Sequence, residues 1–263
     1  MTKKTSDYLN FAIQTALNAG NLIREARSQI KLLAVVDQDN KGLITDADLK
    51  SDEYILHAIR SIYPTHAILT EESGQNGESD YEWIVDPIDG TNNFRRGDPH
   101  FSISIGLRKQ NFGIVGVVYA PALDVLYYAT DGGGAFMKQH GKIRQLHVSG
   151  KDSLKMFTMS FATGIDFQDP KTSDQIVAAI RDSGLFTNFR RRMLESTALE
   201  LCYVAEGRFD AHFNNSAKPW DIAAGEVVVR EAEGVADNLA NEKILASNGV
   251  IHQKLIEVIK PFV

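Results

Sequence analysis

The chain has 263 residues, of which 43% are hydrophobic and 24% charged, a balance that excludes an intrinsically disordered protein. Its 28 basic and 34 acidic residues give a net charge of −6, which argues against nucleic acid as a general ligand or substrate, because such binders concentrate positive charge. The single cysteine, Cys202, excludes an intrachain disulfide and a cysteine-based zinc site. The first residues lack an apolar stretch of signal-peptide length, and Pro121 and Asp124 interrupt the most apolar segment. We therefore expect a cytoplasmic protein without a membrane segment.

The first half of the sequence predicts two helices followed by the strands of one sheet. Apolar residues recur at helical spacing from Leu9 to Ile23 and again from Leu49 to Ile62. Thr45 is placed to cap the second helix, with Asp48 at the capping-box position. Short runs rich in β-branched and aromatic residues then predict strands at 67–70, 82–85, 101–107, 113–119 and 125–129.

The second half predicts alternating strands and helices. Strands are expected at 155–161 and 209–213, and helices at 172–183, 196–205, 219–232 and 251–259. The chain has no repeat of fixed period and no linker rich in Pro, Gly or Ser. We therefore predict a mixed α/β (α+β) fold in a single unit over residues 1–263, with two closely packed sheet-and-helix halves, roughly 1–150 and 151–263.

The segment Trp83–Phe94 joins a buried type of strand to a turn that contains two carboxylates. Asp86 and Asp89 follow the strand, and Gly90 and Thr91 can open a short helix whose free amides face an anion. Two carboxylates aimed at one point repel each other unless they are protonated or bridged by a cation, and hard oxygen ligands suit magnesium. The alternative is a turn with a helix cap and no chemistry.

Two other places supply carboxylates of the same kind. Glu71 and Glu72 follow the strand at 67–70, and Asp221 follows Pro219 and Trp220 at the start of a helix. The alternative for the glutamates is a solvated strand end. For Asp221 it is the stabilisation that the helix dipole gives to an acid in the first turn.

Together these segments resemble the signature of the inositol monophosphatase family, the magnesium-dependent, lithium-sensitive phosphatases. The resemblance rests on three motifs, Glu71-Glu72-Ser73, Asp86-Pro87-Ile88-Asp89-Gly90-Thr91 and Trp220-Asp221-Ile222-Ala223-Ala224-Gly225. It extends to the stretches 43–48, 116–121, 133–136 and 234–237, and so covers nearly the whole chain. It implies a layered α-β-α-β-α sandwich of the inositol monophosphatase and fructose bisphosphatase type.

The resemblance also implies the ligands of two or three Mg²⁺ ions. Glu71, Asp86 and the carbonyl of Ile88 would hold the first ion. Asp86, Asp89 and Asp221 would hold the second, and a third would share Glu71. In such a site the first ion polarises a water molecule, and the second stabilises the leaving oxygen of an in-line displacement at phosphorus.

The resemblance makes Thr91 and Asp48 the pair that orients and deprotonates the water, and it groups Glu71 with them as a catalytic residue. The capping-box position of Asp48 is an explanation that needs no catalysis.

Substrate contacts are implied for Asp89, Gly90, Thr91, Arg192, Asn214 and Asp221. For Arg192 the alternative is a solvated run of arginines. Two positions depart from the family pattern. Glu195 stands where the family usually has glycine, which predicts a less tight turn. Asn214 stands where many inositol phosphatases place a glutamate, and its amide brings no charge and adds donors.

We therefore predict a magnesium-dependent phosphomonoesterase that hydrolyses inositol 1-phosphate or a similar small polyol or sugar phosphate. Two alternatives stay open. One is a fructose 1,6-bisphosphatase or a phosphatase of NADP or another nucleotide, with the same fold. The other is a fold retained for binding a protein or RNA partner. The resemblance further implies a homodimer.

Overall fold

The computed structural model describes residues 3–28, 35–37, 43–150, 156–162, 171–184, 188–239 and 242–262. Its helices are α1 (Lys3–Ser28), α2 (Asp46–Ile62), α3 (Thr91–Arg96), α4 (Lys171–Asp182), α5 (Thr197–Ala205), α6 (Pro219–Glu231), α7 (His252–Ile259) and the 3₁₀ turn η1 (Lys260–Phe262). None of the helices in these ranges is both long and apolar enough to cross a membrane.

The first sheet is formed by residues between 67 and 145. Its strands are β3 (Ala67–Thr70), β4 (Gly74–Asn76), β5 (Tyr81–Asp89), β6 (Ser102–Lys109), β7 (Phe112–Ala120), β8 (Val125–Thr130), β9 (Gly134–Gln139) and β10 (Lys142–Gln145). They lie in the order β10-β9-β8-β7-β6-β5-β3-β4. All neighbours pair antiparallel except β3 and β5, which are parallel.

The second sheet is formed by residues between 157 and 247. Its strands are β11 (Phe157–Ala162), β12 (Phe189–Arg192), β13 (Ala211–Asn214), β14 (Val235–Leu239) and β15 (Lys243–Ser247), in the order β12-β11-β13-β15-β14. The strand β11 is parallel to both of its neighbours. A separate two-stranded ribbon, β1 (Val35–Asp37) and β2 (Leu43–Thr45), precedes α2, and the side chain of Thr45 lies outside the described part of the chain.

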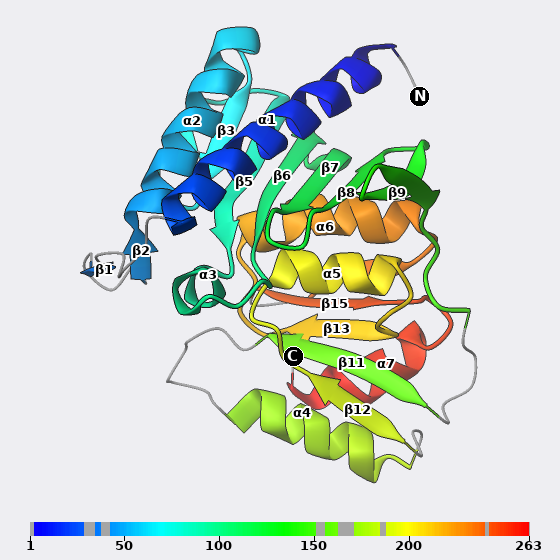
Figure 1. Cartoon of the computed structure of the whole chain (residues 1–263). Helices are drawn as coiled ribbons and strands as arrows, with labels where there is room; N and C mark the ends of the chain where they lie inside the picture. Colours follow the sequence, from blue (N-terminus) through cyan, green and yellow to red (C-terminus); the bar gives the residue numbers. More distant parts are fainter. Residues whose placement is uncertain are drawn as a thin grey trace.

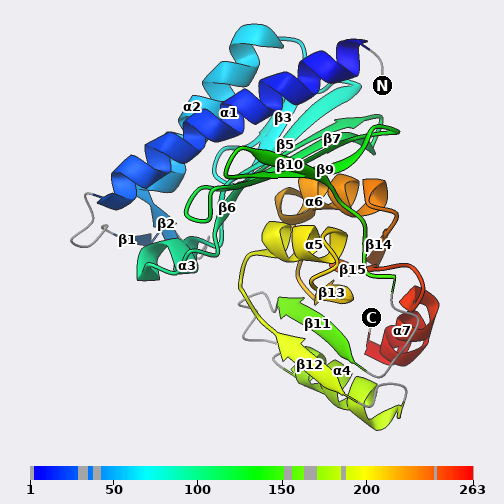
Figure 2. The same cartoon turned by 45° about the vertical axis from the view of Figure 1, so that its right-hand side comes forward.

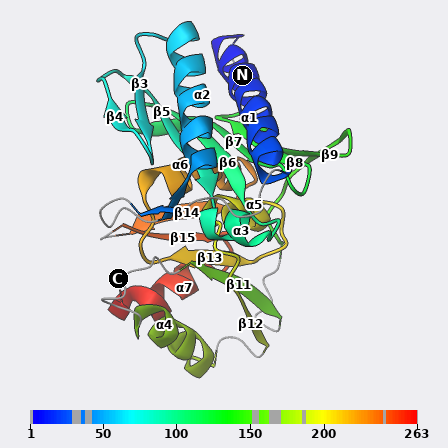
Figure 3. The same cartoon turned by 60° about the vertical axis from the view of Figure 1, so that its left-hand side comes forward.

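The elements stack in five layers, as the family resemblance implies. Helices α1 and α2 cover one face of the first sheet, α5 and α6 lie between the two sheets, and α4 and α7 cover the far face of the second (Figures 1, 2 and 3). Successive side chains of a strand point to opposite faces. In β15, for example, Ile244 and Ala246 join the core around α5 and α6, while Leu245 joins the core around α4 and α7.

Two features of this fold bring the acidic segments together. Because β3 and β5 are parallel, their carboxyl ends meet at one edge of the sheet, and the Glu71 amide continues the ladder by donating to the Val85 carbonyl at 3.2 Å. Glycines on β6 and β7 let α6 approach the sheet closely: a Cβ on Gly116 would lie 2.2 Å from the Ala224 carbonyl oxygen. The start of α6, with Asp221, is therefore held against the ends of the same strands.

Candidate active site

The core of the site is the end of β5, where the ladder with β6 is interrupted. The pairing register shifts between Asp86 and Asp89, so the intervening residues form a bulge that turns the strand into α3. Asp86 is 2% exposed, and its Oδ1 accepts a hydrogen bond from the Ile88 amide at 3.0 Å. The bulge thus keeps a buried carboxylate aimed at the edge of the sheet.

The carboxylate of Asp89 is bound by four donors from other elements. Its Oδ2 accepts from the Ser102 hydroxyl at 3.2 Å, from the Ser196 hydroxyl at 2.5 Å and from the Ala198 amide at 3.1 Å. Its Oδ1 accepts from the Thr197 amide at 3.1 Å. Asp89 therefore ties the end of β5 to the start of α5, where unpaired amides favour an anion.

Thr91 and Asp48 form a pair across the helices α3 and α2. The Thr91 hydroxyl lies 3.2 Å from Asp48 Oδ1 and 3.0 Å from the Ile88 carbonyl oxygen, and it can donate its single proton to either. Asp48 is 2% exposed. The pair that the family resemblance implies is therefore in contact.

Asp221 lies in the first turn of α6 and caps that helix. Its Oδ2 accepts from the Lys218 amide at 2.8 Å in a capping box, and Pro219 occupies the first turn. The Ser104 hydroxyl of β6 donates to the Trp220 carbonyl at 3.3 Å, which fixes the helix start to the first sheet. Asp221 therefore caps α6, as its position in the first turn predicts. Besides burial, the charge of Asp89 raises the pKa of Asp221, so the two acids interact.

Burial and mutual repulsion raise the pKa values of the clustered acids. Desolvation first, then the charges of Asp221, Glu72 and Asp48, raise the pKa of Glu71 to about 8. Desolvation, followed by the charge of Glu71, raises the pKa of Asp86. The Glu71 residue nevertheless stays exposed to solvent.

The remaining two acids are affected in the same direction. Burial raises the pKa of Asp89 to about 6 in spite of its four donors. Burial, and then the charge of Asp89, raise the pKa of Asp221 to about 7. At neutral pH the cluster is therefore partly protonated unless a cation offsets its charge.

The chemistry of this donor set fits a hard divalent cation, although its oxygens are not gathered around one point. Within the described ranges, no group of three or more His, Cys, Asp or Glu side chains is arranged to hold a metal ion as it stands. Asp89 turns both oxygens to the start of α5, and Asp221 turns one oxygen to Lys218. All candidate donors are oxygens, and the mutual repulsion of Glu71, Asp86 and Asp221 is what a bound cation would relieve.

Two predicted substrate contacts, Arg192 and Asn214, form hydrogen bonds within the protein instead. Arg192, the last residue of β12, is exposed, and its Nη1 donates to the Arg191 carbonyl at 3.0 Å. Asn214 is 4% exposed; its Nδ2 donates to Thr197 Oγ1 at 2.9 Å, and its Oδ1 accepts from the Ser216 amide at 2.8 Å. Asn214 thus supports the start of α5 by its amide contacts.

The turn before α5 packs directly on the acidic loop. Glu195 adopts φ 56°, in the left-handed region that glycine occupies readily, so the turn keeps a glycine-type conformation and the expected loosening is wrong. Gly90, at φ 88°, allows this contact, because a Cβ there would lie 2.9 Å from the His100 carbonyl oxygen and 3.1 Å from that of Glu195. Asn93 completes the junction: its Nδ2 donates to the carbonyls of His100 and Leu194 at 2.7 and 2.5 Å.

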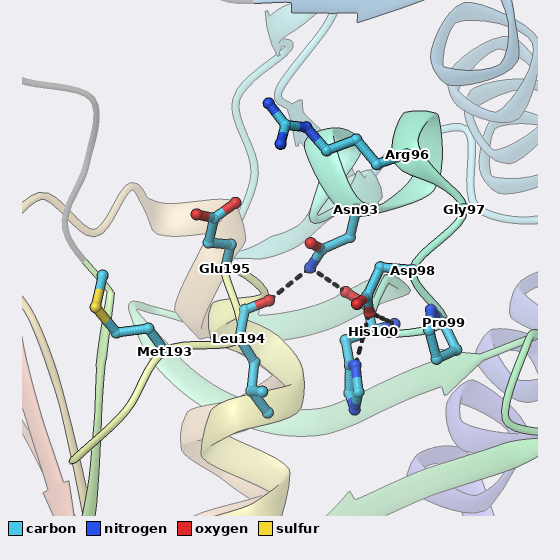
Figure 4. Close-up of a pocket in the computed structure, with 9 residues that line it drawn as sticks. All are labelled: Asn93, Arg96, Gly97, Asp98, Pro99, His100, Met193, Leu194 and Glu195. Atoms are coloured by element: carbon cyan, nitrogen blue, oxygen red, sulfur yellow. Dashed lines mark hydrogen bonds and ion pairs between the residues drawn. The ribbon is translucent and has the colours of Figure 1, made fainter.

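A pocket of about 600 Å³ opens beside this junction (Figure 4). Its lining consists of Asn93, Arg96, Gly97, Asp98, Pro99, His100, Met193, Leu194 and Glu195. None of the residues predicted as ligands or substrate contacts lines it. The pocket therefore borders the candidate site without including its chemistry.

The backbone of Glu195 yields a stability prediction. A non-glycine residue in the left-handed region is strained by about 1 kcal/mol, so Glu195→Gly is expected to stabilise the protein by up to that amount and to raise Tm by about 3 °C. Differential scanning calorimetry measures this gain. Glu233→Gly is a second test of the same strain in another turn, because Glu233 has φ 69° and, among the described residues, its side chain has only an exposed pairing with His147 to lose. Both variants should gain stability, and a loss in both would contradict the strain.

Sequence reasoning did not find the residues that bind Asp89 or hold the turn. Ser196 and Thr197 have the character of a helix cap, which was a usable signal. Ser102 and Asn93 carry no local signal, because their partners are distant in sequence.

Comparison with known proteins identifies the family. A profile of the inositol monophosphatase family matches residues 4–260. The chain belongs to the inositol monophosphatase family. It is 39% identical over 250 residues to the Nus factor SuhB of Haemophilus influenzae, covering 92% of this chain and 90% of that protein. It is 33% identical over 269 residues to the fructose-1,6-bisphosphatase/inositol-1-monophosphatase of Aquifex aeolicus, covering 97% and 96% of the two chains.

A solved structure of the family has the same fold. The extragenic suppressor protein suhB of Bartonella henselae superposes with a TM-score of 0.87 at 29% identity, over 98% of this chain and all of that one. The five-layer architecture is therefore that of the inositol monophosphatase family.

Proposed function

We propose that this chain is a magnesium-dependent phosphomonoesterase. The observation that carries the proposal is the proximity of Glu71, Asp89 and Asp221 to the buried Asp86, whose pKa is raised by desolvation and then by their charges, beside the bonded pair Asp48 and Thr91. Membership in the inositol monophosphatase family supports the same activity.

The clustered acids and one backbone carbonyl are the proposed metal ligands. Glu71, Asp86, Asp89, Asp221 and the Ile88 carbonyl would hold two or three Mg²⁺ ions. Bound magnesium would supply Lewis acidity for the attacking water and for the leaving oxygen.

The remaining residues orient the water and the phosphate. The Thr91 hydroxyl accepts a hydrogen bond from the attacking water while it donates to Asp48, and Asp48 takes up the proton. The amides of Gly90 and Thr91, at the start of α3, would bind the phosphate oxygens. Because Asp48 is buried and hydrogen-bonded, its carboxylate is held in place for this transfer.

The proposed substrate is inositol 1-phosphate or another small polyol or sugar phosphate. A bisphosphate or a nucleotide would need a second basic contact beyond Arg192, which lies at the surface. Asn214 does not choose among these esters, because its amide is buried and bonded to Thr197 and Ser216. We also propose a homodimer, which sedimentation analysis would detect as twice the chain mass.

A panel of phosphate esters tests the activity. Phosphate release is measured from both enantiomers of inositol 1-phosphate, glycerol 2-phosphate, fructose 1,6-bisphosphate and NADP, with magnesium titrated from zero and lithium added as an inhibitor. We expect release that requires magnesium and that lithium suppresses. Release that is independent of magnesium, or none from any ester by folded protein, would refute the proposed activity.

A second candidate function is partner binding, and the names of the relatives favour it. A relative that covers most of this chain at 39% identity is named a Nus factor. Under this proposal the fold presents a surface to a protein or RNA partner in addition to its site. An Asp86→Asn variant that loses turnover but still replaces the native protein in cells would support partner binding. A variant that loses turnover and also fails to replace the native protein would refute partner binding.

A further inference from the structure

A buried polar cluster lies beneath the turn that precedes α5. Glu200 and His212 are both 0% exposed, and so is Ser160. Ser160 and His212 pair across the parallel strands β11 and β13, and Ser160 Oγ lies 2.9 Å from His212 Nδ1. His212 Nδ1 is 3.9 Å from Glu200 Oε2, beyond hydrogen-bonding distance.

This cluster is poorly satisfied as a core feature. Glu200 Oε2 and His212 Nε2 are buried atoms without a hydrogen-bond partner among the residues that the structure describes. Burial raises the pKa of Glu200 and lowers the pKa of His212 to about 3. Ser160 also acts on Glu200 through a side-chain hydrogen bond that lowers its pKa. An apolar pair of the same shape would still avoid two unsatisfied atoms, so core packing alone does not call for a glutamate here.

The bonded oxygen of Glu200 points instead to the turn at the candidate active site. Glu200 Oε1 accepts from the Leu194 amide at 3.1 Å, while the Leu194 carbonyl accepts from Asn93 at 2.5 Å. Leu194 is therefore held from both sides of its backbone, immediately before Glu195 takes the left-handed conformation.

The two hydrogen bonds to the Leu194 backbone position the groups that bind Asp89. The Ser196 hydroxyl and the backbone amides of Thr197 and Ala198 donate hydrogen bonds to the Asp89 carboxylate. These three donors follow the turn directly, so the direction of the turn decides where they point. Asp89 in turn is a proposed ligand of the second magnesium ion.

We propose that Glu200 is a positioning residue, which holds the Leu194 turn so that the start of α5 orients Asp89. The proposal rests on the proposed phosphatase function for its kinetic effect. Glu200 contacts neither substrate nor metal, and it acts only through the backbone of the turn.

Three variants separate positioning from core packing. Glu200→Met removes the acceptor while it keeps the length of the side chain, and Glu200→Gln keeps an acceptor oxygen. His212→Phe is the matched core control, because it changes the same cluster without touching Leu194. If Glu200→Met does not fold, Glu200→Asp retracts the acceptor by one methylene group and takes its place.

The kinetic readout is kcat together with the magnesium concentration that gives half-maximal rate. Loss of one buried hydrogen bond at the turn is expected to lower kcat by about tenfold in Glu200→Met and to raise the magnesium concentration for half-maximal rate by a similar factor. Glu200→Gln and His212→Phe should stay within about twofold of the native values. Native kinetics in Glu200→Met, or the same losses in His212→Phe, would overturn the proposal.

A readout without substrate keeps this proposal distinct from the proposed function. Hydrogen exchange of the 194–198 amides is expected to be about tenfold faster in Glu200→Met, and native in Glu200→Gln and His212→Phe. If the native protein releases no phosphate from any ester, the phosphatase proposal fails while this exchange still decides the positioning role. Unchanged exchange in Glu200→Met would overturn that role.

Discussion

Asp86→Asn is expected to abolish magnesium-dependent phosphate release, with a loss of about a thousandfold or more. Asp86 is the proposed bridge between two ions, and an amide supplies no negative charge to either. The fold should survive, since the Asn Oδ1 can still accept from the Ile88 amide that now lies 3.0 Å from Asp86 Oδ1. Turnover of the preferred ester and Tm, measured on the same preparation, check both parts.

The control for this variant is an acid outside the cluster. Asp182 is exposed and pairs with Arg181 at 2.8 Å, so Asp182→Asn removes the same charge from the chain without touching the site. Its turnover should be native. Near-native turnover in Asp86→Asn would remove this residue from the site, and an unfolded Asp86→Asn would be replaced by Asp86→Glu, for which we expect a large but smaller loss.

The parts of the site that the sequence predicts are those encoded in a short segment. The end of β5, the bulge and the start of α3 all lie in Trp83–Phe94, where two acids and a glycine fall within five residues. The contact of Thr91 with Asp48 is long-range, but the family resemblance supplies it. The family resemblance thus indicates which carboxylates belong together.

The contacts that orient these acids could not be predicted, because they join residues far apart in sequence. Asp89 is bound by Ser196, which follows it by 107 residues, and Asn93 binds Leu194, 101 residues later. Neither pair leaves a periodicity or spacing that a local pattern can detect. Their partners are decided by how α5 packs between the two sheets.

Strands at the sheet edges were missed for a different reason. The strand β12 consists of Phe-Arg-Arg-Arg, and all four residues of β10 are exposed. Edge strands of this kind bury few side chains, so they lack the apolar alternation by which strands are predicted. The core strands β5 to β8 carry that alternation or a continuous apolar run, and they were predicted.

The metal-free protein is expected to lose stability as pH rises through neutrality. The folded-state pKa values of Glu71, Asp89 and Asp221 are raised to about 8, 6 and 7, above the ordinary values near 4 of the unfolded chain. Between these limits the folded protein binds more protons than the unfolded one, so the free energy of unfolding falls with increasing pH. The stabilisation that these protonated acids give the folded state is complete below about pH 4. It is lost as pH rises through their folded-state pKa values, about 6 to 8.

Magnesium should reverse this trend at the same acids. A divalent cation stabilises their ionised forms, and a ligand that binds only the folded state raises its stability. The gain in Tm on adding millimolar magnesium to chelator-treated protein is therefore expected to be small near pH 5.5 and largest near pH 8. Every other titrating group contributes equally with and without the cation, so the difference between the two melts isolates the cluster.

Asp86→Asn supplies the internal comparison for this experiment. Removing the buried charge of Asp86 removes its desolvation cost and its repulsion with Glu71, Asp89 and Asp221. It should leave the metal-free variant more stable than the native protein near pH 8, while magnesium adds little. A magnesium gain in the native protein that is equal at both pH values, or that the variant retains in full, would show that these carboxylates do not bind the cation. The pH dependence of the gain thus tests the metal site independently of any substrate.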